Sequence, residues 1–461
     1  MANRFQNSDA SPTGALPRRA LPGRDRQRPV PRGSMSLQLL VIMVPVLFGM
    51  MGFAIDLGRL YLVRGELNQA ANTMAEAAAA QLMGTSASLD TATTVIAQSL
   101  DNTAGLANKY NFGSLLIGQT SGNLSSTVNP PAFYATLTDA ATGGSQADGT
   151  TARYVQVSLL ADAPLLFWSF LPVAQSRKTS VGAMAIAGAS APLCTACGIT
   201  PIVVAAIDPS DTVNFGFGDP TAGNIYTFAF TCSGAPTPSS LGGTVIFYGL
   251  INRYDANNPA LDLSQQLYTS AARGLLASTT PNPNGSLMPI GCVGIGGGPN
   301  ETVWPDVGTN LCSLTVSAGD TTALCGLYAR MPLGPVPAAC TTDITDFANL
   351  SGIYPGDTDL TTAQADPYIA YQGNGQRLLT VSVVDTVANT PSGTMTVLGF
   401  RQFLLEPNST GTFDPSDPKG RFVAQYVGSP APVSQGYIDD RFGLGCPAPV
   451  ASGVSKVVLH Q

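Results

Sequence analysis

The sequence predicts an α+β protein in which an N-terminal transmembrane helix extends into a long helix beyond the membrane, with a small sheet beside it. A mostly-β, disulfide-bearing domain follows. Three observations lead to this expectation. An apolar run near the N-terminus passes into an Ala-rich helical pattern without a break. Charged residues make up only 11% of the 461 residues while Gly and Pro are abundant, as in strand-and-turn architecture. All eight cysteines lie beyond the apolar run.

Residues 1–33 form a basic arm, with seven Arg against Asp9 and Asp25, whereas the rest of the chain is net acidic. The arm has no aromatic interleaving and adjoins an apolar run, so a nucleic-acid partner is not expected. Its richness in Pro, Arg and Ser predicts disorder. The chain is long enough for two or three further domains.

The apolar run covers Leu39 to Ile55 and includes Pro45, which membrane helices tolerate. Seventeen residues rise about 26 Å, which is close to the thickness of a hydrocarbon core. A cleaved signal peptide is disfavoured because no A-x-A-like site follows; Asp56 comes next. Positive charge before the run places the arm in the cytoplasm and exports the remainder. We therefore expect a single-pass signal anchor.

The helical pattern continues beyond the run, and the sequence predicts one element over 34–84 with Gly84 as its C-cap. Apolar residues recur at steps of three and four and line one face. Two interpretations remain open: the face packs on the chain's own globular part, or it meets a partner helix. The residues expected at a partner-helix face are Leu60, Leu67, Ala71, Met74 and Ala78.

The segment Arg32 to Leu82 begins with Arg-Gly and continues with the apolar span, an Asp-Leu-Gly-Arg-x-Tyr motif at 56–61, Gln-Ala-Ala at 69–71 and an Ala-rich tail. In the order and spacing of these features it resembles the N-terminal domain of TadG-like Flp pilus-assembly proteins. Asn72 stands where the family usually has Asp, and Glu76 interrupts the Ala run. The resemblance implies a bacterial inner-membrane protein whose partners are other Tad/Flp pilus-assembly membrane proteins and the lipid bilayer.

Processing by a prepilin peptidase is not expected. Pilin-like substrates of that peptidase carry Gly before the cut and Glu five residues after it. Gly33 is present, but Gln38 occupies the later position. The bond between Gly33 and Ser34 should therefore stay intact.

Residues 85–190 read as a small α+β region, pilin-like by analogy. A helix-leaning segment over 85–111 precedes strand-like alternation at 133–137, 153–161 and 179–189. An apolar stretch at 163–174 lies between the last two strands. It is compatible with a buried helix turn, a membrane-proximal wedge or a partner site.

Residues 191–410 read as a mostly-β exported domain, either a sandwich or a barrel, because short apolar strands alternate with Gly/Pro/Asn-rich loops. The expected strands cover 202–207, 225–232, 243–251, 377–387 and 393–406. Residues 411–461 look like a loop-rich C-terminal tail.

The even number of cysteines in the exported part predicts structural disulfides with open connectivity. The Cys-Thr-Ala-Cys motif lacks the strand-helix context of a redox site, and His460 alone does not supply the histidines of a zinc site. The disulfide candidates are Cys194, Cys197, Cys232, Cys292, Cys312, Cys325, Cys340 and Cys446.

Other chemical signatures are weak. Asp208, Ser210 and Thr212 only partly match a metal-dependent adhesion motif, and the Asp-rich segment 357–366 reads as a solvated acidic turn. The Gly-rich stretch at 291–299 lacks the last Gly of a dinucleotide fingerprint. No catalytic residue, metal, cofactor or small-molecule substrate is expected.

We therefore expect a non-enzymatic, membrane-anchored envelope protein that acts in Tad/Flp pilus assembly or as a minor-pilin-like structural component. The alternative is a membrane-anchored exported binding or adhesion module. A periplasmic hydrolase is a third and less favoured alternative. The expected location is the inner membrane, with the N-terminus cytoplasmic and the bulk of the chain periplasmic or surface-exposed.

Overall fold

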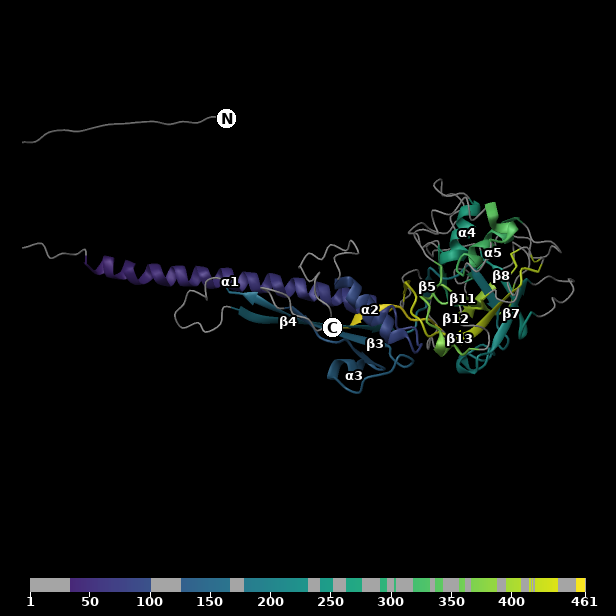
Figure 1. Cartoon of the computed structure of the whole chain (residues 1–461), viewed down its shortest axis with the longest axis horizontal. Coiled ribbons are helices and arrows are strands. Elements are labelled where there is room, and N and C mark those ends of the chain that lie inside the picture. Colours follow the sequence, from purple (N-terminus) through teal and green to yellow (C-terminus); the bar gives the residue numbers. More distant parts are fainter. Residues whose placement is uncertain are drawn as a thin grey trace, which may run out of the picture.

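A computed structural model shows an elongated molecule in which one long helix carries a sheet along its side and a globular β unit at its far end (Figure 1). The mixture of helix and sheet predicted from the sequence is confirmed. The structure describes residues 34–100, 126–165, 178–230, 241–251, 263–275, 291–296, 302–303, 318–331, 336–342, 356–360, 366–387, 395–407, 414–415, 417, 419–437 and 453–460.

The long helix α1 runs from Ser34 to Ala79 as one element of 46 residues, with Pro45 inside it. Among the described residues it is the helix that is long and apolar enough to cross a membrane, and the apolar part is almost entirely exposed. The expected continuation of the apolar helix beyond its span is thus confirmed. Pro45 removes one i→i−4 backbone hydrogen bond, a loss that membrane helices tolerate.

The end of α1 differs from the prediction, which placed the C-cap at Gly84. The helix ends at Ala79: the Ala80 amide still bonds four residues back, to Glu76, but the amides of Gln81 and Leu82 bond three residues back, to Ala78 and Ala79. Such bonds tighten a last turn and satisfy carbonyls that the α-helix leaves open. Gly84 follows this turn with a φ of 79°, a left-handed conformation that favours glycine.

The first sheet covers one side of α1 (Figure 1). Its strands are β1 (Ser126–Val128), β2 (Ala132–Tyr134), β3 (Tyr154–Pro164), β4 (Lys178–Ala189) and β15 (Val457–His460). The order is β1-β3-β4-β15, with β2 also on β3, and every pairing is antiparallel. Helix α2 (Ser88–Leu100) packs against α1, and α3 (Leu137–Thr142) follows β2. The strands predicted at 133–137, 153–161 and 179–189 correspond to β2, β3 and β4.

A closed barrel forms the globular unit. Its order is β12-β11-β6-β8-β7-β13, and β13 pairs again with β12, so the described strands close on themselves. Closure removes unpaired edges. The strands are β6 (Ile202–Ala205), β7 (Ile225–Phe230), β8 (Thr244–Leu250), β11 (Leu378–Val384), β12 (Met395–Leu405) and β13 (Phe422–Gly428), with β10 (Thr302–Val303) added on β12.

The barrel interior is aromatic. Phe217 and Phe228 contact Phe403 edge to face, with ring centroids 5.3 and 5.1 Å apart, and Phe228 stacks on Phe422 at 4.6 Å. Such pairs stabilise a core by about 0.5–1.5 kcal/mol each beyond the area that they bury. The barrel, one of the two architectures left open by the sequence, is therefore filled by side chains.

Smaller elements surround the barrel. A second small sheet joins β14 (Gln435–Tyr437), β5 (Thr195–Cys197) and β9 (Cys292–Gly294). Helices α4 (Leu263–Arg273) and α5 (Ala318–Tyr328) lie together on one side of the barrel (Figure 1). Single 3₁₀ turns are η3 (Pro220–Ala222), η4 (Ala338–Cys340) and η5 (Tyr368–Ala370).

The prediction of a loop-rich tail over 411–461 is wrong for the described part of this range, which contains three strands. Every residue of β13 is buried, because this strand lies between β7 and β12 in the barrel wall. Further along, β15 returns to the first sheet and pairs with β4 from Val457 opposite Ala189 to His460 opposite Ile186. The tail therefore completes both β units.

Candidate functional site

The apolar stripe of α1 lies in the chain's own core along most of its length. Leu67, Ala71, Met74 and Ala78 are at most 4% exposed and belong to one core cluster with strands β3 and β4. Alternate residues of both strands enter this cluster, as expected for the sheet face that covers the helix. For these four helix residues the structure supports the interpretation in which the stripe packs on the chain's own globular part. The strand residues of the cluster are Val155, Val157 and Leu159 on β3 and Ala183, Ala185 and Ala187 on β4.

Leu60, the fifth residue expected at a partner face, lies elsewhere. It lines an open groove of about 460 Å³ between α1 and the start of β4. The groove begins where the apolar part of α1 ends, and β15 does not reach this part of β4, since it pairs only with residues 186–189. Its lining residues are Leu57, Leu60, Tyr61, Arg64, Thr179, Ser180, Val181 and Gly182.

The outward face of α1 is open at the same level. Leu62, on this face, is 68% exposed. A Cβ added at Gly58 or Gly65 would meet nothing within 4 Å. On a helix these positions share the side opposite the sheet, because Gly58, Leu62 and Gly65 are separated by four and three residues. A neighbouring helix could approach the backbone closely there.

The other end of α1 is joined to the barrel by a packed and hydrogen-bonded junction. Met83 is 6% exposed and clusters with Tyr368, Tyr371 and Leu404 of the globular unit. The Tyr368 hydroxyl donates to the Met83 carbonyl oxygen at 2.8 Å. Nearby, the amide and the hydroxyl of Ser86 both donate to the Ile369 carbonyl oxygen, at 2.9 and 3.0 Å. The helix and the barrel are therefore held together by side chains as well as by the chain.

A buried polar cluster supports this junction from the barrel side. Asp357 accepts the Tyr371 hydroxyl and, at 2.8 Å, the Arg377 amide. The guanidinium of Arg377 is fully buried and donates to the carbonyl oxygens of Leu405 and Asp359, both at 2.7 Å. Burial is the main cause that raises the pKa of Tyr371, and the nearby Asp357 carboxylate raises it further. The interpretation of 357–366 as a solvated acidic turn is wrong for Asp357 and Asp359, which are 5% and 7% exposed.

Glu406 is the titratable group of this region whose pKa is shifted into the physiological range. It follows β12, is 2% exposed, and burial raises its pKa to about 7 against the opposing effect of Arg377. Its Oε2 atom has no hydrogen-bond partner within the described part of the chain. A buried carboxyl in this position favours its neutral form.

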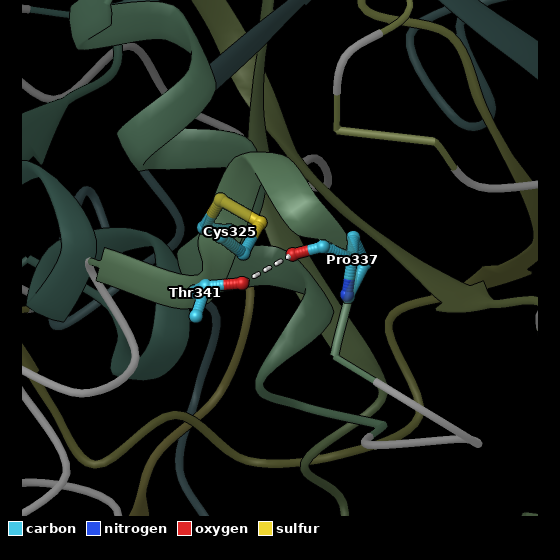
Figure 2. Close-up of a disulfide and its surroundings, with 4 residues drawn as sticks. Cys325, Pro337 and Thr341 are labelled. Atoms are coloured by element: carbon cyan, nitrogen blue, oxygen red, sulfur yellow. Dashed lines mark hydrogen bonds between the residues drawn. A yellow bond between two sulfur atoms is a disulfide. The ribbon is translucent and has the colours of Figure 1, made fainter.

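The disulfides are structural. Cys197 of β5 is bonded to Cys292 of β9, and Cys325 of α5 to Cys340 of η4. Figure 2 shows the second bond, beside which the Thr341 hydroxyl donates to the Pro337 carbonyl oxygen at 3.4 Å. The Cys-Thr-Ala-Cys motif therefore does not form a dithiol pair of its own. Cys194 is also disulfide-bonded, whereas Cys232, Cys312 and Cys446 lie outside the described residues.

The remaining candidate motifs are turns or lack a ligand set. Asp208 Oδ1 accepts the amide and the hydroxyl of Ser210, at 2.9 and 2.6 Å, as in an Asx turn. His460 contacts the Tyr154 ring edge to face. Within the described ranges no group of three or more His, Cys, Asp or Glu residues could hold a metal ion. The Gly-rich stretch is described only up to residue 296, where β9 and a bridge to β12 occupy it.

Sequence reasoning missed the groove, the junction and the buried Asp357–Arg377 cluster. A signal for the last was available, since Arg377 stands directly before an apolar strand, at a position where a charge requires a buried partner. The groove had no such signal, because it depends on how β4 lies against α1.

Comparisons with known proteins bear on the long helix α1 alone. No curated protein and no solved structure shows significant similarity to the chain. A family model does match, over residues 33–81, which contain the whole of α1. Its description is Flp pilus-assembly TadE/G-like. Residues 33–81 are therefore a Tad domain of the TadE/G-like Flp pilus-assembly kind.

Proposed function

We propose that this protein is a TadG-like, non-enzymatic component of Tad/Flp pilus assembly, anchored by α1 in the inner membrane and carrying its barrel on the periplasmic or outer side. The Tad family is non-catalytic in general, and a pilus-assembly role agrees with the match at 33–81. The basic arm before α1 supports a cytoplasmic N-terminus.

One observation carries the proposal: a single helix serves as anchor, scaffold and stalk. Its first part is apolar and exposed, as a lipid-facing span requires. Its last part is buried in the chain's own sheet and ends in the junction around Met83. The helix and its sheet therefore hold the barrel away from the bilayer, at a distance where it could contact an assembling pilus.

We propose that partner membrane proteins contact the outward face of α1 through Gly58, Leu62 and Gly65. These three residues replace Leu67, Ala71, Met74 and Ala78 as the expected partner contact, because the side chains of those four pack against the chain's own sheet. The outward face is apolar, small and open, which suits helix-helix packing near a membrane.

Leu62→Glu tests this contact, with Asn68→Glu as the matched control on another exposed side of the same helix. We expect Leu62→Glu to keep a folded barrel and membrane attachment but to lose crosslinks to other pilus-assembly proteins and most surface pili. The Asn68→Glu variant should assemble pili normally. Unchanged crosslinks and piliation in Leu62→Glu would exclude the outward face.

Topology is tested separately with a reporter that is active only in the periplasm. A fusion after Leu82 should be active and a fusion at Met35 silent, because the basic arm retains the N-terminus in the cytoplasm. The opposite pattern would overturn the anchor orientation without bearing on the fold.

A further inference from the structure

The groove between α1 and β4 lies at the depth of lipid headgroups when α1 spans a bilayer. Leu57 and Arg64 are two and nine residues beyond Ile55, so they rise about 3 and 14 Å past the end of the apolar run. The hydrocarbon core is about 30 Å thick and each headgroup layer adds roughly 5–8 Å. Because that run covers only about 26 Å, Leu57 falls at the edge of the core and Leu60 within the headgroup layer.

Side-chain direction brings the cation of the groove toward the same layer. Helical side chains tilt toward the N-terminus, which for α1 is the membrane end. Arg64 therefore extends its long stem back toward the bilayer, as arginines do when they place a charge at the interface. Tyr61, which also lines the groove, is of the amphipathic aromatic type that is enriched at this depth.

The lining of the groove has the polarity order of a phospholipid. Leu57 and Leu60 line its membrane end, Val181 lines the β4 side, and Arg64 supplies a positive charge at the outer end. Thr179 adds a hydroxyl, and by strand alternation it lies on the same side of β4 as Val181 and the buried Ala183. None of the eight described lining residues is acidic.

Size favours a lipid over a partner helix. A helix with side chains is about 10 Å wide, so three turns of it occupy roughly 1,300 Å³. The groove volume is about 460 Å³. It accommodates a phosphate, its glycerol and the first carbons of an acyl chain.

We propose that this groove binds one phospholipid, with the lipid phosphate on Arg64 and the glycerol and upper acyl carbons against Leu57 and Leu60. Such a site goes beyond a role in assembly, because it fixes the rotation and depth of α1 relative to the bilayer. The lipid occupies the groove between α1 and residues 179–182 of β4.

The test uses the full chain, reconstituted in nanodiscs of phosphatidylcholine with phosphatidylglycerol and then transferred to a mild detergent. Native mass spectrometry counts the phospholipids that remain bound. We expect the parent protein to retain one phospholipid and Arg64→Gln to retain at least tenfold less, because the phosphate loses its counter-charge. Thr179→Trp should have the same effect by filling the groove without changing the charge.

Arg59→Gln is the control for loss of a positive charge from this part of α1, since Arg59 lies about 7.5 Å nearer the membrane along the helix and does not line the groove. It should retain the lipid. Equal retention by the parent, Arg64→Gln and Thr179→Trp proteins would overturn the proposal. Stabilisation of delipidated protein by inorganic phosphate as effectively as by phospholipid would show an anion site instead and would also overturn it.

A photo-crosslinking amino acid in place of Thr179 shows whether a lipid or a protein occupies the groove in cells. A mass increase equal to a phospholipid supports the proposal. A protein adduct in place of the lipid adduct would assign the groove to a partner chain and refute the lipid site.

Discussion

Ala71→Glu places a carboxylate in the middle of the helix-sheet interface. Ala71 is fully buried among the side chains of β3 and β4, and the core cluster that surrounds it contains only apolar residues. A buried ion costs several kcal/mol even after relaxation, and the larger side chain adds about 1–3 kcal/mol of overpacking. Total stabilities of about 5–15 kcal/mol are typical, so the sum removes most or all of the stability of the first unit.

The measurement is thermal unfolding of the full chain in detergent, followed by near-UV circular dichroism and by limited proteolysis of the segment between α1 and β4. Ala71→Glu should be cleaved rapidly there at temperatures where the parent protein resists. Asn68→Glu, an exposed change one turn away, should shift stability by no more than about 0.5 kcal/mol.

The outcome that would refute this reasoning is a folded Ala71→Glu protein. If Ala71→Glu melts like the parent protein but loses its crosslinks to pilus-assembly partners, the apolar stripe of α1 packs against another protein in the assembled complex and not against β3 and β4.

Three further predictions concern the barrel and its junction. The native state favours the protonated form of Glu406, because the pKa of this carboxyl is about 7 and lies above its ordinary value. The contribution of Glu406 to stability should therefore be fully present below about pH 4.5 and fall by at most about 3 kcal/mol as the pH rises to 7. Glu406→Gln should remove this component of the pH dependence in denaturant titrations, and an unchanged dependence would contradict it. Replacing Cys325 and Cys340 together by serine opens a loop of 15 residues and should destabilise the barrel by about 3 kcal/mol, whereas peptide mapping that finds both thiols free in the parent protein would contradict the bond. Met83→Ala should cost about 2–5 kcal/mol at the junction and increase hydrogen exchange around Tyr368 while exchange in the barrel strands stays slow; uniform exchange would show that the junction adds no coupling.

Much of the architecture follows from local patterns. The period of Leu67, Ala71 and Met74 predicts a helix with one apolar face, and alternation in β3, β4, β11 and β12 predicts strands. Such periods show that a face is buried but not what buries it. This is why the stripe of α1 left two interpretations open until the sheet was placed against it.

The rest depends on contacts between distant residues. Strand β13 is seven residues long and follows a segment rich in Pro, Gly and Asp, so its central place in the barrel depends on pairing with β7 and β12. The sequence around Asp357 suggests a solvated turn, because the neighbouring residues do not show that the Arg377 amide, 20 residues later, donates a hydrogen bond to its carboxylate. The same holds for Cys197 and Cys292, which are 95 residues apart.

The return of β15 to the first sheet determines how the molecule bears a pulling force. The chain leaves this sheet at Ala189 of β4 and comes back at Val457 of β15, and these two residues are paired. A pull on the barrel along α1 is therefore divided between two strands that start from the same end. Strand β4 is held along its whole length by 11 pairs with β3. Tension between barrel and membrane is thus borne by this sheet together with the junction around Met83, and no single crossing of the chain carries it alone.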